Sequence, residues 1–186
     1  MNESPLSRIA QILDDEDFAV HFLPATEEAP VDSLYVHLFE DDEERPHVLQ
    51  LLFTNDVANA VGVPDDPDDA VYLQLTHVMP FKVPAERHAE VAFLLFYLNR
   101  LLPSGAFGLS DTENVVFYRD CVTSPDREVD EIVAVESVST ANFFIELFSP
   151  EIEAVATGET TRKDVIEKLT ADGMIAAPVL PFPGIE

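Results

Sequence analysis

The sequence predicts an α+β protein in which an antiparallel sheet of about five strands packs against helices on one face. Segments with alternating apolar residues occur in groups, the first before residue 54 and the last after residue 107. Acidic or proline-bearing loops separate them, as in antiparallel meanders. Segments with helical spacing stand between and after the groups, which is typical of α+β domains. The expected order is helix, three or four strands, helix, two strands, helix (α-β-β-β-α-β-β-α in its five-strand form).

The first half of the chain supplies one helix and most of the strands. Ser4 can cap a helix, Pro5 suits its first position, and the apolar residues up to Leu13 recur at helical spacing. Strands are expected at 18–23, 34–39, 47–54 and 70–79, around an ambiguous segment at 57–63 and an acidic loop at 65–69.

The second half of the chain is mainly helical. A long apolar helix is expected at 85–102, a hairpin at 107–121, a helical region at 126–157 and a short helix at 161–169. We expect Ser149 and Pro150 to break and restart the third of these elements, with Ser149 as the new cap. Gly158 should end it, and Thr160 or Thr161 should cap the last helix. Residues 174–186 contain three prolines and are expected to lie outside the core.

The charge of the chain restricts its partners. Thirty-six Asp and Glu residues face 10 Lys and Arg residues, which gives a formal net charge of −26. A field of that sign repels nucleic acids and anionic membranes. It agrees with three explanations that the sequence does not separate, namely solubility, attraction of basic partners, and adaptation to a salt-rich cytoplasm. The N-terminus shows neither a basic region nor an apolar run, so we expect a cytoplasmic protein.

No catalytic signature is present in the sequence. The six glycines form no nucleotide-binding loop, and no Ser stands in a Gly-x-Ser-x-Gly elbow. Cys121 is the single cysteine, has no nearby His in the sequence, and is expected to be a half-buried, inert thiol. The chain is therefore predicted not to be an enzyme and to need no cofactor.

Two groups of residues are candidates for metal ligands. His21, His37 and His77 could fall on neighbouring strands, but no pair of the five histidines has metal-ligand spacing, so surface or rim positions are favoured. Residues 65–69 supply four Asp residues, yet Pro67 and the missing glycine and closing Glu disagree with an EF-hand loop. A solvated charged turn is favoured, and no metal site is predicted.

Four short segments together resemble one known family. These are the helix entry at 79–84, the helix end at 98–103 with Gly105 and Phe107, the strand at 115–119 and the helical segment at 148–153. In combination they resemble the YbjN-like bacterial family, which is similar to the class I type III secretion chaperones. The resemblance covers about residues 4–158. It divides the chain into a chaperone-like α+β domain at 1–158 and a short helix with a Pro-rich tail at 159–186. It implies a small acidic dimer that holds another protein, with no catalytic residues to carry over.

The helix at 85–102 indicates where such a dimer would form. Residues 91–98 are apolar on every side of the helix, whereas a helix on one sheet needs an apolar stripe only. The second apolar face needs a cover, either the helical region at 126–157 or a second subunit. Together with the family resemblance, the need to cover this second apolar face favours a homodimer. The residues expected at the dimer or partner surface are Phe93, Phe96, Tyr97 and Arg119. For Arg119, the favoured alternative is a surface ion pair, with Asp120 of a neighbour or with Glu113.

The sequence therefore leads to a non-enzymatic protein-binding module, chaperone-like or regulatory. It would act as a homodimer and hold a segment of an unknown protein client. The alternative is a sensory or regulatory domain that binds a small ligand or a metal ion in a pocket between sheet and helices. A hydrolase without recognisable motifs is the weakest of the three hypotheses.

Overall fold

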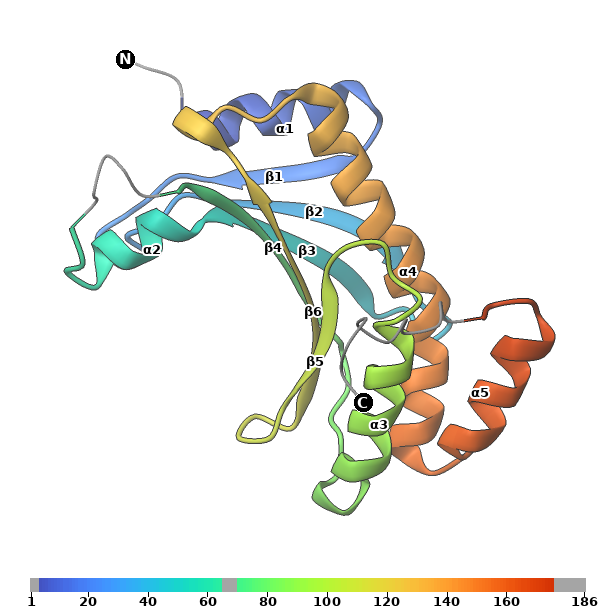
Figure 1. Cartoon of the computed structure of the whole chain (residues 1–186). Coiled ribbons are helices and arrows are strands. Elements are labelled where there is room, and N and C mark those ends of the chain that lie inside the picture. The colour runs from blue at the N-terminus through green and yellow to red at the C-terminus, as the bar shows by residue number, and fades with distance from the viewer. Residues whose placement is uncertain (1–3, 65–69, 176–186) are drawn as a thin grey trace, which may run out of the picture.

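The computed structural model describes residues 4–64 and 70–175 (Figure 1). The expectations for the acidic loop at 65–69 and for the tail from residue 176 onward lie outside the described residues. The fold is α+β, as predicted, with helices against one face of an antiparallel sheet.

Six strands form the sheet, one more than the five-strand order and within the range expected from the sequence. They run in the spatial order β1-β2-β3-β4-β6-β5, and every neighbouring pair is antiparallel. The strands are β1 (Ala19–Leu23), β2 (Ser33–Glu40), β3 (Pro46–Phe53), β4 (Tyr72–Val78), β5 (Ala106–Ser110) and β6 (Val115–Thr123).

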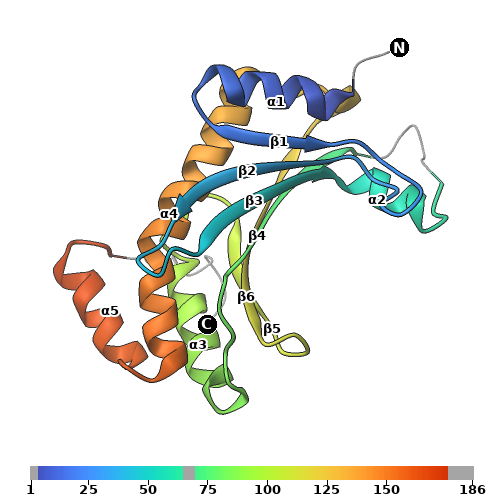
Figure 2. The ribbon, with the colours of Figure 1, turned by 180° about the vertical axis from the view of Figure 1, so that it is seen from behind.

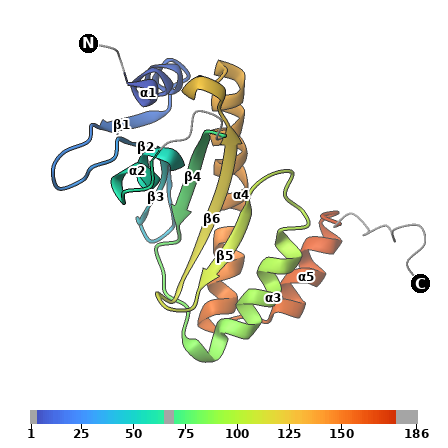
Figure 3. The same ribbon diagram turned by 60° about the vertical axis from the view of Figure 1, so that its left-hand side comes forward.

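Five α-helices accompany the sheet in the described residues. They are α1 (Pro5–Asp15), α2 (Thr54–Ala60), α3 (His88–Leu98), α4 (Glu131–Thr157) and α5 (Arg162–Ala171). Helices α1, α3 and α4 cover one face, and α5 packs on α3 as an outer layer (Figures 1 and 2). The short helix α2 lies beyond the end of β3, and the opposite face of the sheet carries no helix in the described part of the chain (Figure 3).

The core forms between the covered sheet face and the inner sides of α1, α3 and α4. Strand residues alternate between the two faces, so that Leu49, Leu51 and Phe53 are buried while their neighbours are less covered. From α4, Ile145 and Phe148 enter the same core with no exposed surface. Because each buried apolar side chain of this size contributes about 2 kcal/mol, this single core holds the sheet and the helices together.

The helix α4 differs from its expected form. It is one continuous helix that contains Pro150, so the predicted break at Ser149 and Pro150 is wrong. Phe148 and Ile152 on either side are fully buried, and this packing outweighs the hydrogen bond that proline removes. The helix also begins later than residue 126, at Glu131, where the Asp130 side chain accepts a hydrogen bond from the Ile132 amide.

The other helix ends are partly as predicted. Gly158 ends α4 with a positive φ of 84°, and Thr161 caps α5 by accepting from the Asp164 amide. Ser4 does not cap α1, because its hydroxyl donates to Asp32 instead. The expected helix at 85–102 is shorter, since residues 85–87 form a 3-10 turn and α3 covers His88–Leu98.

Candidate functional site

Phe93 and Phe96 form an exposed apolar pair on the outer side of α3. Their side chains are 53% and 66% exposed, and their ring centroids lie 6.1 Å apart. The guanidinium of Arg162, from α5, lies 5.1 Å from the centre of the Phe93 ring. Apart from this contact, neither α4 nor α5 covers the pair within the described chain, although Val91, Leu94, Leu95 and Leu98 of the same helix are buried.

Tyr97 lies on a different side of α3 from the exposed pair. It is half-buried, and its hydroxyl lies 3.4 Å from the carbonyl oxygen of Met174, which follows α5. Tyr97 therefore helps to hold the end of α5 against α3. Of the predicted surface residues, only Phe93 and Phe96 are brought together, because Arg119 lies on β6.

Arg119 belongs to the uncovered face of the sheet. It pairs in register with Thr76 on β4 and with Ala106 on β5. The predicted ion pair with an acid is wrong for the described residues, among which Arg119 makes no hydrogen bond or ion pair. Among the described residues it is thus an exposed cation without a carboxylate partner, in a protein that is rich in carboxylates.

The uncovered sheet face, which we call the open face, carries no acidic side chain in its described strands except Glu40 at its rim. The strand registers and the alternation of burial place on it a mixture of apolar, hydroxyl, amide and histidine residues. The open face comprises Ala19, His21, Leu23, Ser33, Tyr35, His37, Val48, Gln50, Leu52, Tyr72, Gln74, Thr76, Val78, Ala106, Gly108, Ser110, Phe117, Arg119, Cys121 and Thr123. The strands contain two acids: Glu40, at the rim beyond the β-bulge of β2, and Asp120 of β6, which is in register with Leu75 on the covered side.

Polar groups on the open face are partly paired with one another. The Gln50 amide donates to the Tyr35 hydroxyl at 3.1 Å, and the Gln74 amide donates to the Thr76 hydroxyl at 3.0 Å. Cys121 is exposed, not half-buried as predicted, because β6 places it on this face. Its partial burial still raises the thiol pKa, which lowers its reactivity.

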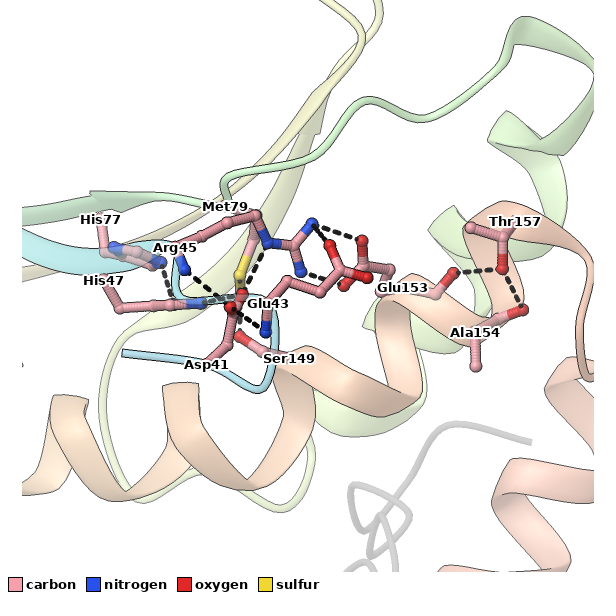
Figure 4. A network of polar contacts seen from close by, with 10 residues as sticks. All are labelled: Asp41, Glu43, Arg45, His47, His77, Met79, Ser149, Glu153, Ala154 and Thr157. Atoms are coloured by element: carbon pink, nitrogen blue, oxygen red, sulfur yellow. Dashed lines mark hydrogen bonds and ion pairs between the residues drawn. The ribbon is translucent and has the colours of Figure 1, made fainter. Parts of the chain in front are cut away.

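A second polar site lies at one end of β3 and β4, beneath the loop that joins β2 to β3 (Figure 4). His47 and His77 are each only 1% exposed. His47 Nδ1 lies 3.2 Å from His77 Nε2, and His77 Nδ1 lies 2.9 Å from the Val48 carbonyl oxygen. On the other side, His47 Nε2 lies 3.4 Å from Asp41 Oδ2. The predicted surface or rim position is therefore wrong for His47 and His77.

Their burial could have been read from the strand pattern. His47 is in phase with Leu49 and Leu51, and His77 is in phase with Leu73 and Leu75. Period-two alternation therefore assigns both histidines to the core side of the sheet. Metal-ligand spacing along the sequence does not reveal the contact between His47 and His77, because the two residues lie on different strands.

Arg45 links this site to α4. Its Nη1 and Nη2 atoms donate to both carboxylate oxygens of Glu153, at 2.8 and 2.6 Å, and its Nε atom donates to Asp41 Oδ2 at 2.7 Å. Glu43 lies 3.1 Å from the same guanidinium. This bidentate contact fixes the β2–β3 loop against the helix, as Figure 4 shows.

The pKa values of the site follow from burial and these contacts. Burial alone would raise the pKa of Asp41, but hydrogen bonds from Arg45, the Glu43 amide and His47 outweigh it and lower the pKa to about 2. Burial lowers the pKa of His47, although Asp41 acts in the opposite direction. Burial also lowers the pKa of His77 to about 4. Near neutral pH, Asp41 is thus ionised and His77 is neutral.

A cavity of about 460 Å³ opens between the β2–β3 loop and α4. Its lining includes Phe39, Phe81, Glu146 and Glu153, together with the site residues Asp41, Arg45 and His47. Ser149 also lines it, but its hydroxyl donates to Met79 Sδ at 3.0 Å and not to His47. The arrangement is therefore not a Ser–His pair for nucleophilic catalysis.

Two further features of the described residues concern metals and membranes. No group of three or more His, Cys, Asp or Glu side chains in the described chain could hold a metal ion. By length and composition α4 could cross a membrane, but core helices of soluble proteins meet the same criterion, and α4 packs in the core. The expected absence of a membrane partner stays a prediction.

The chain was also compared with known proteins. No protein-family model matches it and no curated protein is significantly similar to it, so the resemblance to the YbjN-like family and the class I type III secretion chaperones stays a prediction.

Proposed function

We propose that this chain is a non-enzymatic protein-binding module that acts as a homodimer in the cytoplasm and holds a segment of a partner protein. The single observation that carries the proposal is the open face. In a chain with 36 acidic residues, the strand registers place only Glu40, at the rim, on this face among the described strand residues, although the face spans six strands. Such a face is adapted to being covered by another protein, because a carboxylate buried in an interface without a partner is costly.

The chemistry of the open face suits a peptide segment of mixed polarity. Side chains such as Val78, 52% exposed, offer apolar contact area, while Gln50 and Gln74 offer amide donors and acceptors. Arg119, on β6 next to the edge strand β5, would meet a carboxylate of the partner. The acidic rim would meet basic residues that flank the bound segment, which is the attraction expected from the sequence.

The dimer would form through α3. Phe93 and Phe96 are the exposed aromatic pair of that helix, and covering them would recover about 2 kcal/mol for each side chain. A C2 dimer presents the same patch from both subunits, so this pair would meet its own copy. The open face is on the other side of the sheet from the helix layer and would stay free for the partner.

Site-specific photo-crosslinking tests the role of the open face. A photoreactive phenylalanine analogue at Thr76 should form one dominant covalent adduct with another protein in native cells, while the same analogue at Glu136, exposed on α4, should not. Val78→Glu, which places an acid on the open face, should abolish the Thr76 adduct, and Ile132→Glu, at a 71% exposed position on α4, should leave it unchanged. Adducts of equal yield at both positions would contradict the proposal.

A second candidate function rests on the cavity beside Arg45. Its lining combines Phe39 and Phe81 with many carboxylates, so it would suit a small organic cation better than an anion. Native mass spectrometry separates this function from the first. A small molecule that stays bound, together with no crosslinked protein at Thr76, would favour a sensory domain over a protein-binding module.

A further inference from the structure

Four polar groups form an unbroken row in the interior, and both ends of the row can only accept hydrogen bonds. The row runs from Asp41 Oδ2 to His47, at 3.4 Å, from His47 to His77, at 3.2 Å, and from His77 to the Val48 carbonyl oxygen, at 2.9 Å. An ionised carboxylate and a backbone carbonyl carry no hydrogen to donate. All three contacts must therefore be made by N–H groups of the two imidazole rings.

Two neutral imidazoles do not supply enough hydrogens for this row. Each neutral ring carries one N–H, so the pair has two N–H groups for three contacts. If His77 donates to Val48, its Nε2 atom accepts from His47 Nδ1, and His47 Nε2 then faces Asp41 as a second acceptor. The reverse tautomers would place two acceptors only 2.9 Å apart at Val48. The missing hydrogen thus belongs at the longest contact, between His47 and Asp41.

We propose that Asp41, His47 and His77 form a buried binding site for one proton, which enters at His47 Nε2 and completes the row while His77 stays neutral. The uptake forms one N–H bond and leaves an imidazolium beside an ionised carboxylate. The contact with Asp41 then becomes a charge-assisted hydrogen bond, which is typically shorter than 3 Å.

The charges around the pair agree with a single proton. The β2–β3 loop contributes Asp41, Glu43 and Arg45, and α4 contributes Glu153 and Glu146 at the cavity. Tyr118 is the register partner of His77 on β6, and burial raises its pKa to about 12, so it stays neutral.

Carboxylates outnumber the one arginine, which favours a first positive charge near Asp41, and burial opposes that charge. A charged His47 also lowers the pKa of His77, which opposes a second proton.

Nitrogen NMR of the full chain with labelled histidines tests the proposal directly. Above about pH 8, well above the ordinary histidine pKa, both rings should be protonated at Nδ1 only. As the pH falls, His47 Nε2 should gain a hydrogen while His77 keeps its neutral pattern. Joint titration of His47 and His77, or a first proton on His77, would overturn the one-proton site.

Two variants that each remove one negative charge distinguish the effect of the hydrogen-bonded row on His47 from the effect of the surrounding charges. In Asp41→Asn, the amide can donate to neutral His47, so the third hydrogen comes from the protein and proton affinity at His47 should fall at least about tenfold, or one pKa unit. Asp42→Asn removes the neighbouring charge and leaves the row intact, so its effect should stay within about twofold. Equal effects of both variants would show that the electrostatic field of the carboxylates, and not the hydrogen-bonded row, sets the proton affinity of His47.

A metal ion is the alternative occupant of the space between the two facing acceptors, His47 Nε2 and Asp41 Oδ2. Zinc binds imidazole nitrogen and carboxylate oxygen at about 2.0–2.2 Å, and in a tetrahedral site such ligands lie close to each other. The described residues nevertheless supply no third ligand there. Zinc added at one equivalent should leave the His47 signals unchanged at about pH 7, where the ordinary histidine is mostly neutral. Stoichiometric shifts confined to His47 would replace the proton by a metal and refute the proposal.

Discussion

At the residue scale, Arg45 is the side chain on which the polar site depends. It contacts Asp41, Glu43 and Glu153, and thereby joins a surface loop to α4. Its own exposure and those of Asp41 and Glu153 are a quarter or less, so solvent screens these contacts only partly. Removing the cation leaves three carboxylates facing one another.

We expect Arg45→Ala to lower the free energy of unfolding by about 2 kcal/mol, the usual cost of losing charge-assisted hydrogen bonds. Arg45→Lys should recover only part of this loss, because an ammonium group does not form the two parallel bonds to Glu153. Lys163→Ala is the control, since its pair with Glu167 is exposed and should contribute less than about 1 kcal/mol. Urea unfolding monitors all three variants, and equal losses for Arg45→Ala and Lys163→Ala would contradict this role.

His77 predicts how stability depends on pH. Its pKa is about 4 in the folded chain and 6.5 in the unfolded one, so the unfolded state binds the proton more tightly. The contribution, about 3 kcal/mol in total, is fully present above about pH 6.5 and is lost as the pH falls to about 4.

The variant His77→Gln should flatten this part of the stability profile, and the exposed His21→Gln should leave its slope unchanged. Thermal unfolding at intervals between pH 7 and about 5 measures both slopes. A wild-type slope that survives in His77→Gln would show that other groups dominate.

At the element scale, α4 tolerates a proline because of its surroundings. Proline in a helix interior is strongly unfavourable by propensity, and yet the helix continues past Pro150 for seven residues to Thr157. Buried residues on both sides of Pro150 keep the helix on the core, and Pro150 itself lies on the exposed side.

Pro150→Ala should therefore stabilise the chain by about 1 kcal/mol, because alanine restores an amide that can donate to the carbonyl of Glu146. Glu146→Ala, an exposed change one turn earlier, should stay within about 0.5 kcal/mol. Differential scanning calorimetry of both variants measures the change. A lower melting temperature for Pro150→Ala would mean that α4 bends at this residue to fit the sheet.

At the scale of the whole molecule, the two exposed surfaces have different consequences. The Phe93 and Phe96 pair predicts self-association. Light scattering coupled to size exclusion should give twice the chain mass of 20.6 kDa at micromolar concentration. Phe96→Asp should give the monomer mass, while Ile132→Asp, at a more exposed position on α4, should remain dimeric. A monomeric wild type at high loading would remove the dimer from the proposed function.

The net charge predicts a response to salt. The described acidic runs at 14–17 and 40–44 concentrate like charges near loops, and their repulsion destabilises the folded state at low ionic strength. The melting temperature should therefore rise from about 10 mM to about 500 mM NaCl, as screening sets in over about 10 Å. KCl should act equally. A melting temperature that does not change with salt would show that the charges are dispersed well enough not to repel.

The sequence by itself determined the fold class, most strand positions and the apolar character of α3 on every side. These follow from local periodicity, since alternation by two or by 3.6 residues places each side chain on a face. Only tertiary structure decided that α4 continues through Pro150, that Phe93 and Phe96 stay uncovered while Tyr97 turns to α5, and that Arg119 lies without an acid on the open face.

The pairing of His47 with His77 was likewise decided by the register of β3 against β4. These features depend on contacts between segments distant in sequence, which no local pattern encodes.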